Sequence, residues 1–215
     1  MQKHTLPTIQ GLYVITDPLL CPNEQLLPKV EAAILGGAQV VQYRDKTQGW
    51  AQQQKMAQAL RHLTLEHDVC FIINDNIALA EAVQADGVHL GKEDGEPAHV
   101  RAILGPEKWI GVSCYNSVQR ALAMQQAGAN YVAFGRFYPS QTKPDAPAAD
   151  LQTLHDAKRL LSLPKVAIGG ITAEKAPALR QAGADCIAVI HSVFQHEHLP
   201  DITQACQQLR ASFSL

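Results

Sequence analysis

Short apolar runs recur along the chain at nearly even spacing, and segments with the polarity pattern of surface helices lie between them. Four of these runs are largely continuous and end at polar or turn residues, as expected of parallel strands that are covered on both faces. They are Leu12–Thr16, Cys70–Ile73, Ile110–Ser113 and Val166–Ile168. The pattern therefore predicts four buried strands.

A repeated motif predicts four more strands. It consists of a Gly or its substitute, then Ala, a polar residue, any residue and an apolar one, and each copy follows a helix-like stretch. The copies are Gly37-Ala38-Gln39-Val40-Val41, Gln84-Ala85-Asp86-Gly87-Val88, Gly128-Ala129-Asn130-Tyr131-Val132 and Gly183-Ala184-Asp185-Cys186-Ile187. Gly at the end of a helix is typical of a C-terminal stop, so each copy indicates a helix that leads directly into a strand.

The segments between the strands predict helices. We expect them at Glu24–Leu35, Trp50–His67, Ile77–Val83, Val118–Ala127, Leu151–Leu161, Ala173–Ala182 and Ile202–Ser212, with a shorter one near Ala98–Leu104. Eight alternations in 215 residues leave about 27 residues per unit, which suits a compact (β/α)8 barrel of the α/β class. We therefore predict a single TIM-barrel domain over residues 1–215. An open doubly wound sheet is the weaker alternative, because no Gly-x-Gly-x-x-Gly follows the first strand.

Composition narrows the class of protein. Apolar residues make up 47% of the chain and charged residues 18%, as in soluble globular proteins. The net charge of -2 lacks the basic footprint that nucleic-acid binding needs. We expect no membrane partner, because no segment approaches the ~18 apolar residues that cross a bilayer. Five cysteines without a CxxC pair favour the reducing cytoplasm over a disulfide framework or zinc ribbon.

Polar residues gather where the predicted strands end, which is where barrels of this class carry their chemistry. Gln42, Arg44 and Lys46 alternate along the end of the second strand, so their side chains point the same way. Taken alone, these cations are as expected for a solvated surface. With Lys143 as a third cation, they indicate a polyanionic ligand such as a phosphate ester.

Two carboxylates follow adjacent strands. Asp75 comes after the third strand and Asp94 after the fourth, and hard oxygen ligands of this kind hold Mg2+ beside phosphorylated substrates. Asp75 could instead cap the next helix, and Asp94 could be a turn residue. A general acid and base pair is a third reading, without an evident nucleophile.

The last two strands indicate a phosphate site. Gly169-Gly170 and Ile190-His191 follow the seventh and eighth strands, where barrels often bind phosphate through backbone N–H groups. The alternative is a Gly-Gly pair that only permits a tight turn. We assign no proton-transfer role to His89 or His191, and we interpret the cysteines as core residues.

The chain resembles the thiamine phosphate synthase family through seven stretches that occur in order. They are GLYVITD from Gly11, VVQYRDK from Val40, FIIND from Phe71, GVHLGKED from Gly87, IGVSC from Ile110, VAFGRFYPSQTKPDAP from Val132 and VAIGGIT from Val166. The resemblance implies that 4-amino-5-hydroxymethyl-2-methylpyrimidine diphosphate condenses with a thiazole phosphate to give thiamine phosphate and diphosphate. It also implies a Mg2+ cofactor, a dissociative reaction and a homodimer.

The resemblance assigns residues to each ligand. Catalytic roles fall to Lys143, Arg44 and Ser113, and Asp75 and Asp94 hold the metal. The pyrimidine diphosphate is bound by the segment Gln42, Tyr43, Arg44, Asp45 and Lys46 together with Asn74, Ser113 and Lys143. The thiazole phosphate is bound by Ser140, Gln141, Thr142, Gly170, Ile190 and His191. His191 stands where many family members carry Ser, and Asp45 replaces the commoner Glu on the opposite side of the strand.

Two other functions compete with this interpretation. A barrel of the TenI type would aromatise a thiazole tautomer phosphate, and it would need a proton shuttle and no diphosphate site. A noncatalytic barrel would bind phosphate ligands without forming product. The synthase is favoured by the joint presence of Gln42, Arg44, Lys46, Asp75, Asp94 and Lys143.

Overall fold

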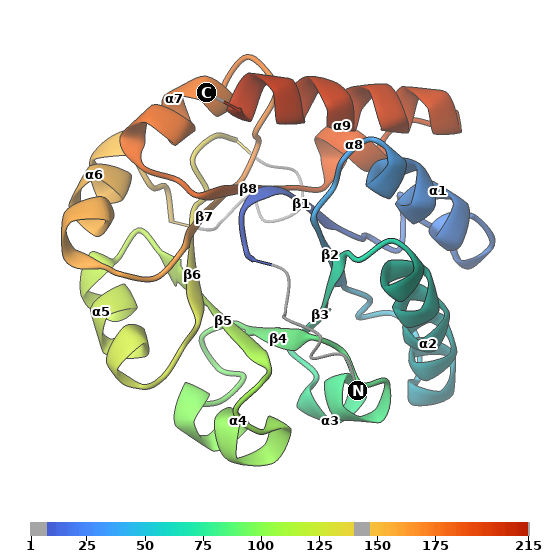
Figure 1. Cartoon of the computed structure of the whole chain (residues 1–215), viewed down its shortest axis with the longest axis horizontal. Coiled ribbons are helices and arrows are strands. Elements are labelled where there is room, and N and C mark those ends of the chain that lie inside the picture. The colour runs from blue at the N-terminus through green and yellow to red at the C-terminus, as the bar shows by residue number, and fades with distance from the viewer. Residues whose placement is uncertain (1–7, 140–146, 215) are drawn as a thin grey trace.

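Eight parallel strands close into a barrel in chain order, with β8 paired to β1, and the helices surround it (Figure 1). The computed structural model describes residues 8–139 and 147–214. The strands are β1 (Gly11–Ile15), β2 (Val40–Tyr43), β3 (Cys70–Asn74), β4 (Gly87–Leu90), β5 (Trp109–Tyr115), β6 (Tyr131–Phe134), β7 (Lys165–Ile168) and β8 (Cys186–Val189). The helices are α1 (Asn23–Leu35), α2 (Trp50–Glu66), α3 (Ile77–Ala82), α4 (Pro97–Leu104), α5 (Val118–Gln126), α6 (Leu151–Leu160), α7 (Ala176–Ala182), α8 (His191–Phe194) and α9 (Leu199–Phe213). The predicted TIM barrel is confirmed.

Alternation along the strands divides the buried residues into two layers. In β1, Leu12 and Val14 belong to the large cluster that fills the space between strands and helices. Their neighbours Tyr13 and Ile15 belong to a smaller cluster inside the barrel. Because successive side chains of a strand point to opposite faces, each strand contributes to both layers.

The repeated motif has a structural role at the start of the strands. Its polar residue accepts a hydrogen bond from the backbone N–H group at the beginning of the neighbouring strand. The pairs are Asp86 Oδ2 with Phe71 N at 2.9 Å, Asn130 Oδ1 with Ile110 N at 2.8 Å and Asp185 Oδ2 with Lys165 N at 2.8 Å. These three copies therefore tie β4 to β3, β6 to β5 and β8 to β7.

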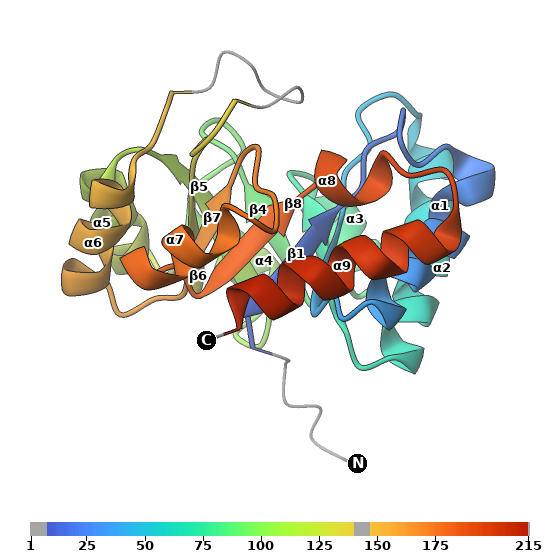
Figure 2. The same cartoon turned by 90° about the horizontal axis from the view of Figure 1, so that it is seen from above.

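The observed elements differ from the predicted ones mainly at their ends. The short helix that the sequence placed near Ala98–Leu104 forms as α4. The four-residue helix α8, which lies above α9 in the side view of Figure 2, was not predicted. Helix α7 begins at Ala176 rather than Ala173, because Pro177 lies in its first turn, where proline favours a helix start. Among the described helices, none is long and apolar enough to cross a membrane.

Candidate active site

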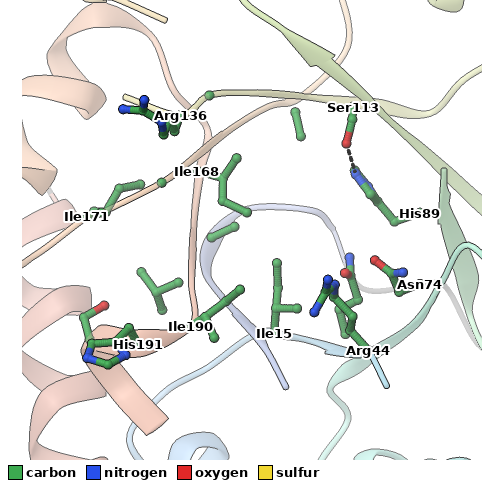
Figure 3. Close-up of a pocket in the computed structure, with 18 of the residues that line it drawn as sticks. Ile15, Arg44, Asn74, His89, Ser113, Arg136, Ile168, Ile171, Ile190 and His191 are labelled. Atoms are coloured by element: carbon green, nitrogen blue, oxygen red, sulfur yellow. Dashed lines mark hydrogen bonds between the residues drawn. The ribbon is translucent and has the colours of Figure 1, made fainter. Parts of the chain in front are cut away.

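A cavity of about 360 Å³ opens where the strands end. It is lined by residues from all eight strands, β1 to β8, and from the loops that follow them. Figure 3 shows Arg44, Asn74, His89 and Ser113 on one side and Arg136 and His191 on the other. Apolar side chains, including Ile15, lie between these polar groups. A site with two polar sides and an apolar middle can hold two different ligands at once.

Gln42 and Arg44 reach the cavity from the end of β2. Gln42 is buried, and its Nε2 atom donates to the Tyr13 hydroxyl at 2.6 Å. The backbone of Arg44 is held by Thr16, whose Oγ1 accepts from Arg44 N at 2.9 Å. The Arg44 guanidinium lies 4.0 Å from the Asp17 carboxylate, and its side chain is 18% exposed. Arg44 is therefore a partly shielded cation that faces the cavity.

Asp75 lies at the mouth of the cavity with two charged neighbours. Lys46 Nζ is 2.7 Å from Asp75 Oδ2, and Asp94 lies beside the same carboxylate. Burial alone would raise the pKa of Asp75, but the Lys46 ammonium and a hydrogen bond with Asp94 bring it below its ordinary value. Burial and the Asp75 carboxylate raise the pKa of Asp94. The two acids behave as an interacting pair.

The alternative roles considered for the two acids have different outcomes. Asn76, not Asp75, caps α3, since its Oδ1 accepts from Leu79 N at 3.0 Å. Asp75 has a φ of 60°, a left-handed conformation that is uncommon for a residue other than Gly. Asp94 does hold its turn, because Oδ2 accepts from Gly91 N at 2.8 Å. Its carboxylate nevertheless stays beside Asp75.

The two carboxylates fit a hard divalent cation. A Cβ atom added to Gly91 would lie 2.6 Å from Asp94 Oδ2 and 4.0 Å from Asp75 Oδ1, so the glycine keeps the space beside both acids open. Residues 8–139 and 147–214 contain no cluster of three or more metal-ligating side chains. Mg2+ suits such a site, because it binds through one or two carboxylates and completes its shell with water and substrate phosphates.

Ser113 and His89 face each other from β5 and β4 (Figure 3). His89 Nε2 is 3.0 Å from Ser113 Oγ, and both residues line the cavity. The Ser113 carbonyl accepts from Arg120 Nε at 3.1 Å, which fixes the end of β5. Asn74 lies next to them at the end of β3. These groups offer hydrogen bonds near Arg44 and Asp75.

The opposite side of the cavity is built from the ends of β7 and β8. Gly169 and Gly170 have φ values of 107° and 60°, which L side chains rarely adopt. Thr172 lines the cavity there, and its buried Oγ1 has no hydrogen-bond partner among the described residues. The amides of His191 and Ser192 precede the first internal hydrogen bonds of α8, which begin at Val193. Such amides are typical partners of a phosphate.

Several predicted site residues lie elsewhere. Tyr43 is buried in the cluster between the barrel and the helices and does not line the cavity, so its assignment to substrate binding is corrected. It was misplaced because it alternates with Gln42 and Arg44 along the strand. Asp45, which was also assigned to substrate binding, does not line the cavity either; its carboxylate accepts from Thr47 N at 2.7 Å. Lys46 pairs with Asp75 outside the cavity lining. Ser140, Gln141, Thr142 and Lys143 lie outside the described residues.

Two cationic side chains of the cavity were not assigned to a ligand from the sequence. Arg136 follows β6, and Lys175 precedes α7. Lys175 Nζ donates to the Gly170 carbonyl at 3.2 Å and lies 4.7 Å from the centre of the Tyr138 ring. The predicted helix Ala173–Ala182 would have included Lys175. Pro177 was the available signal, because a proline in the first turn moves the helix start beyond Lys175.

Comparisons with known proteins agree on one family. The family model described as thiamine monophosphate synthase matches residues 12–193. The chain is 46% identical over 208 residues to the thiamine-phosphate synthase of Alcanivorax borkumensis, which covers 97% of this chain and 96% of the relative. It is 47% identical over 204 residues to that of Thiobacillus denitrificans, with 95% of each chain covered. The solved structure of thiamine phosphate pyrophosphorylase from Pyrococcus furiosus is similar with a TM-score of 0.86 and 35% identity, over 98% of this chain and 96% of that one.

Proposed function

Because the chain belongs to the thiamine monophosphate synthase family, we propose that it is a transferase of thiamine biosynthesis that forms thiamine phosphate. Its substrates are 4-amino-5-hydroxymethyl-2-methylpyrimidine diphosphate and 4-methyl-5-(2-phosphooxyethyl)thiazole, or the carboxylated tautomer of the thiazole. The observation that carries this proposal is the division of one cavity into a side with Arg44 and Asp75 and a side with Gly170 and His191. The first side suits a diphosphate and the second a single phosphate.

The chemistry follows from where charge develops. As the bond between the pyrimidine methylene and diphosphate breaks, negative charge grows on the diphosphate and positive charge on the methylene. Arg44 and Ser113 lie where they can stabilise the leaving group by charge and hydrogen bonding, and preorganised groups of this kind contribute strongly to catalysis. The thiazole nitrogen, held in the same cavity, then captures the methylene cation. The reaction needs no covalent nucleophile from the protein.

Asp75 and Asp94 are the residues that would hold Mg2+. When bound, the ion supplies positive charge to the leaving diphosphate. Without any bound ion, Lys46 neutralises part of the Asp75 charge, because its Nζ lies 2.7 Å from Asp75 Oδ2. We propose that Lys143 adds a further cation to this side and that Ser140, Gln141 and Thr142 contact the thiazole phosphate. The proposed homodimer and cytoplasmic location rest on the family resemblance and the sequence composition.

Product analysis distinguishes the synthase from its two rivals. The full chain is incubated with Mg2+ and both substrates, and parallel reactions omit one substrate each. Mass spectrometry should detect thiamine phosphate only when both substrates are present. Aromatisation of a thiazole tautomer without the pyrimidine would instead support the tautomerase, and binding of both ligands without product would support the noncatalytic barrel.

The metal assignment has its own test. Asp75→Asn and Asp94→Asn should each lower turnover by about two orders of magnitude, the scale on which leaving-group stabilisation acts. The Mg2+ concentration at half-maximal rate should rise in both variants. Asp156→Asn, at a partly exposed position of α6, is the matched control and should leave the Mg2+ response unchanged. Unaltered Mg2+ dependence in both the Asp75 and the Asp94 variant would remove the two residues from the metal site.

A further inference from the structure

A chain of hydrogen bonds crosses the interior of the barrel beneath the cavity. Gln42 Nε2 contacts the Tyr13 hydroxyl at 2.6 Å, and that hydroxyl is 3.1 Å from the Tyr131 hydroxyl. The Tyr131 hydroxyl is 3.1 Å from His89 Nδ1, and His89 Nε2 is 3.0 Å from Ser113 Oγ. The five residues come from β2, β1, β6, β4 and β5. Both ends of the chain, Gln42 and Ser113, line the cavity.

The middle of this chain is sealed from solvent. Tyr13 is 1% exposed and Tyr131 is fully buried, and neither lines the cavity. Gly111 pairs with Tyr131 in the strand register, and a Cβ atom at Gly111 would overlap the Tyr131 ring. The absence of a side chain at Gly111 therefore makes room for the Tyr131 ring inside the barrel. Burial raises the pKa of both phenols, so each keeps its single proton.

Counting protons fixes the direction of every bond. Gln42 Nε2 can only donate, so the Tyr13 hydroxyl accepts from it and has its own proton left for Tyr131. Tyr131 then accepts from Tyr13 and donates to His89 Nδ1. With Nδ1 as acceptor, neutral His89 carries its proton on Nε2 and donates to Ser113. Ser113 therefore has its hydroxyl proton available for the cavity, and Gln42 has its carbonyl oxygen available.

We propose that this chain is a positioning device that sets the hydrogen-bonding polarity of the cavity, with Tyr13, Tyr131 and His89 as positioning residues. It fixes an acceptor at Gln42 and a donor at Ser113. A ligand with a donor at one end and anionic oxygens at the other fits this polarity in one orientation. The substrate assignment rests on the proposed function, in which an aminopyrimidine carries the donor and its diphosphate carries the oxygens.

The tautomer of His89 tests the direction of the chain without any substrate. In NMR spectra of the whole protein labelled with 15N-histidine, His89 should show a protonated Nε2 and an unprotonated Nδ1. The His89→Gln variant assigns the signal. Gln42→Glu introduces an ionised carboxylate that can only accept, once the pH exceeds the titration of that carboxyl. Every bond in the chain then reverses, and the His89 proton should move to Nδ1.

Cutting the chain supplies the decisive comparison. Tyr131→Phe removes the link between Gln42 and His89, so adding Gln42→Glu to Tyr131→Phe should leave the His89 tautomer unaltered. Tyr43→Phe removes a buried hydroxyl that is not part of the hydrogen-bond chain. It should leave the 15N chemical shifts of His89 as they are in the unmodified protein. Thermal melting of each variant verifies that it is folded. A proton on Nδ1 in the unmodified protein, or an unchanged tautomer in Gln42→Glu, would overturn the proposal.

Kinetics show whether the polarity serves the reaction. Tyr131→Phe should lower kcat/KM for the pyrimidine diphosphate about tenfold, the equivalent of one well-placed hydrogen bond. Its KM for the thiazole phosphate should stay the same, which a general loss of structure would not produce. Equal losses for both substrates would refute the positioning role. Failure of the unmodified protein to form product would contradict the proposed function and leave the tautomer result to stand by itself.

Discussion

The carboxyl of Asp75 shows how neighbouring groups set the charge of the cavity mouth. Burial favours its neutral form, yet Lys46 at 2.7 Å and a hydrogen bond with Asp94 bring its pKa below the ordinary value. A carboxyl whose pKa is lower in the folded than in the unfolded chain contributes stability above its unfolded pKa. That contribution is lost as the pH falls through the folded pKa.

Replacing Lys46 tests this balance. Lys46→Met should raise the pKa of Asp75 and, to a smaller degree, that of Asp94, because both carboxyls lose the same nearby cation. The substitution should also lower the free energy of unfolding at pH values above the unfolded pKa of Asp75, where the lowered pKa of this carboxyl stabilises the fold. A carboxyl 13C NMR titration measures both values. Lys55→Met, on the exposed surface of α2, is the control, and identical titration curves for the two variants would contradict the explanation.

Lys175 gives a second prediction at the scale of one residue. Its ammonium lies beside Gly170 and the Tyr138 ring, on the side of the cavity that we assign to the thiazole phosphate. Lys175→Ala should raise KM for the thiazole phosphate about tenfold, as expected for one charge-assisted contact to phosphate. The KM for the pyrimidine diphosphate should change little. A selective rise in KM for the pyrimidine diphosphate would contradict the assignment of Lys175 to the thiazole phosphate.

At the scale of the element, the repeated motif joins neighbouring strands at their starts. In one copy, the Asp86 carboxylate accepts from Phe71 N and from Arg61, each at 2.9 Å. Asp86→Ala leaves a buried N–H group and a largely buried guanidinium without their acceptor. We expect it to lower the free energy of unfolding by about 2–4 kcal/mol.

Urea unfolding measures that loss. The matched control is Asp156→Ala, which removes an ion pair with Arg159 on the surface of α6 and should change stability by less than about 0.5 kcal/mol. Equal effects of the two substitutions would show that the motif does not tie the strands together.

The sequence predicted the elements well where periodicity and stop signals agree. Helix ends at Gly183 and apolar runs such as Val166–Ile168 are local features, so they could be recognised without the fold. Helix α8 could not, because four residues are too few to show a helical period. Tyr43 was misplaced because the whole segment 42–46 was assigned to the substrate. The alternation that turns Gln42 and Arg44 toward the cavity turns Tyr43 to the opposite face of the strand.

At the scale of the whole molecule, closure of the barrel brings together residues that are distant in sequence. The sequence alone predicted that Gln42, Arg44, Asn74 and Ser113 share one rim, and these residues line one cavity. The interior chain through Tyr13, Tyr131 and His89 was not predictable, because it depends on the register of five strands rather than on any local pattern. The arrangement gives the barrel one cavity with two chemically different sides.

We propose that Arg44 and its neighbours stabilise a leaving diphosphate while a second phosphorylated substrate is bound in the same cavity. The most direct measurement is the rate of thiamine phosphate formation from both substrates and Mg2+, compared between the unmodified protein and Arg44→Gln. Equal melting temperatures of the two proteins verify that the variant is folded. We expect product from the unmodified protein and a rate about 100-fold lower in the variant. Equal rates in the two proteins, or no thiamine phosphate from the unmodified one, would contradict the account.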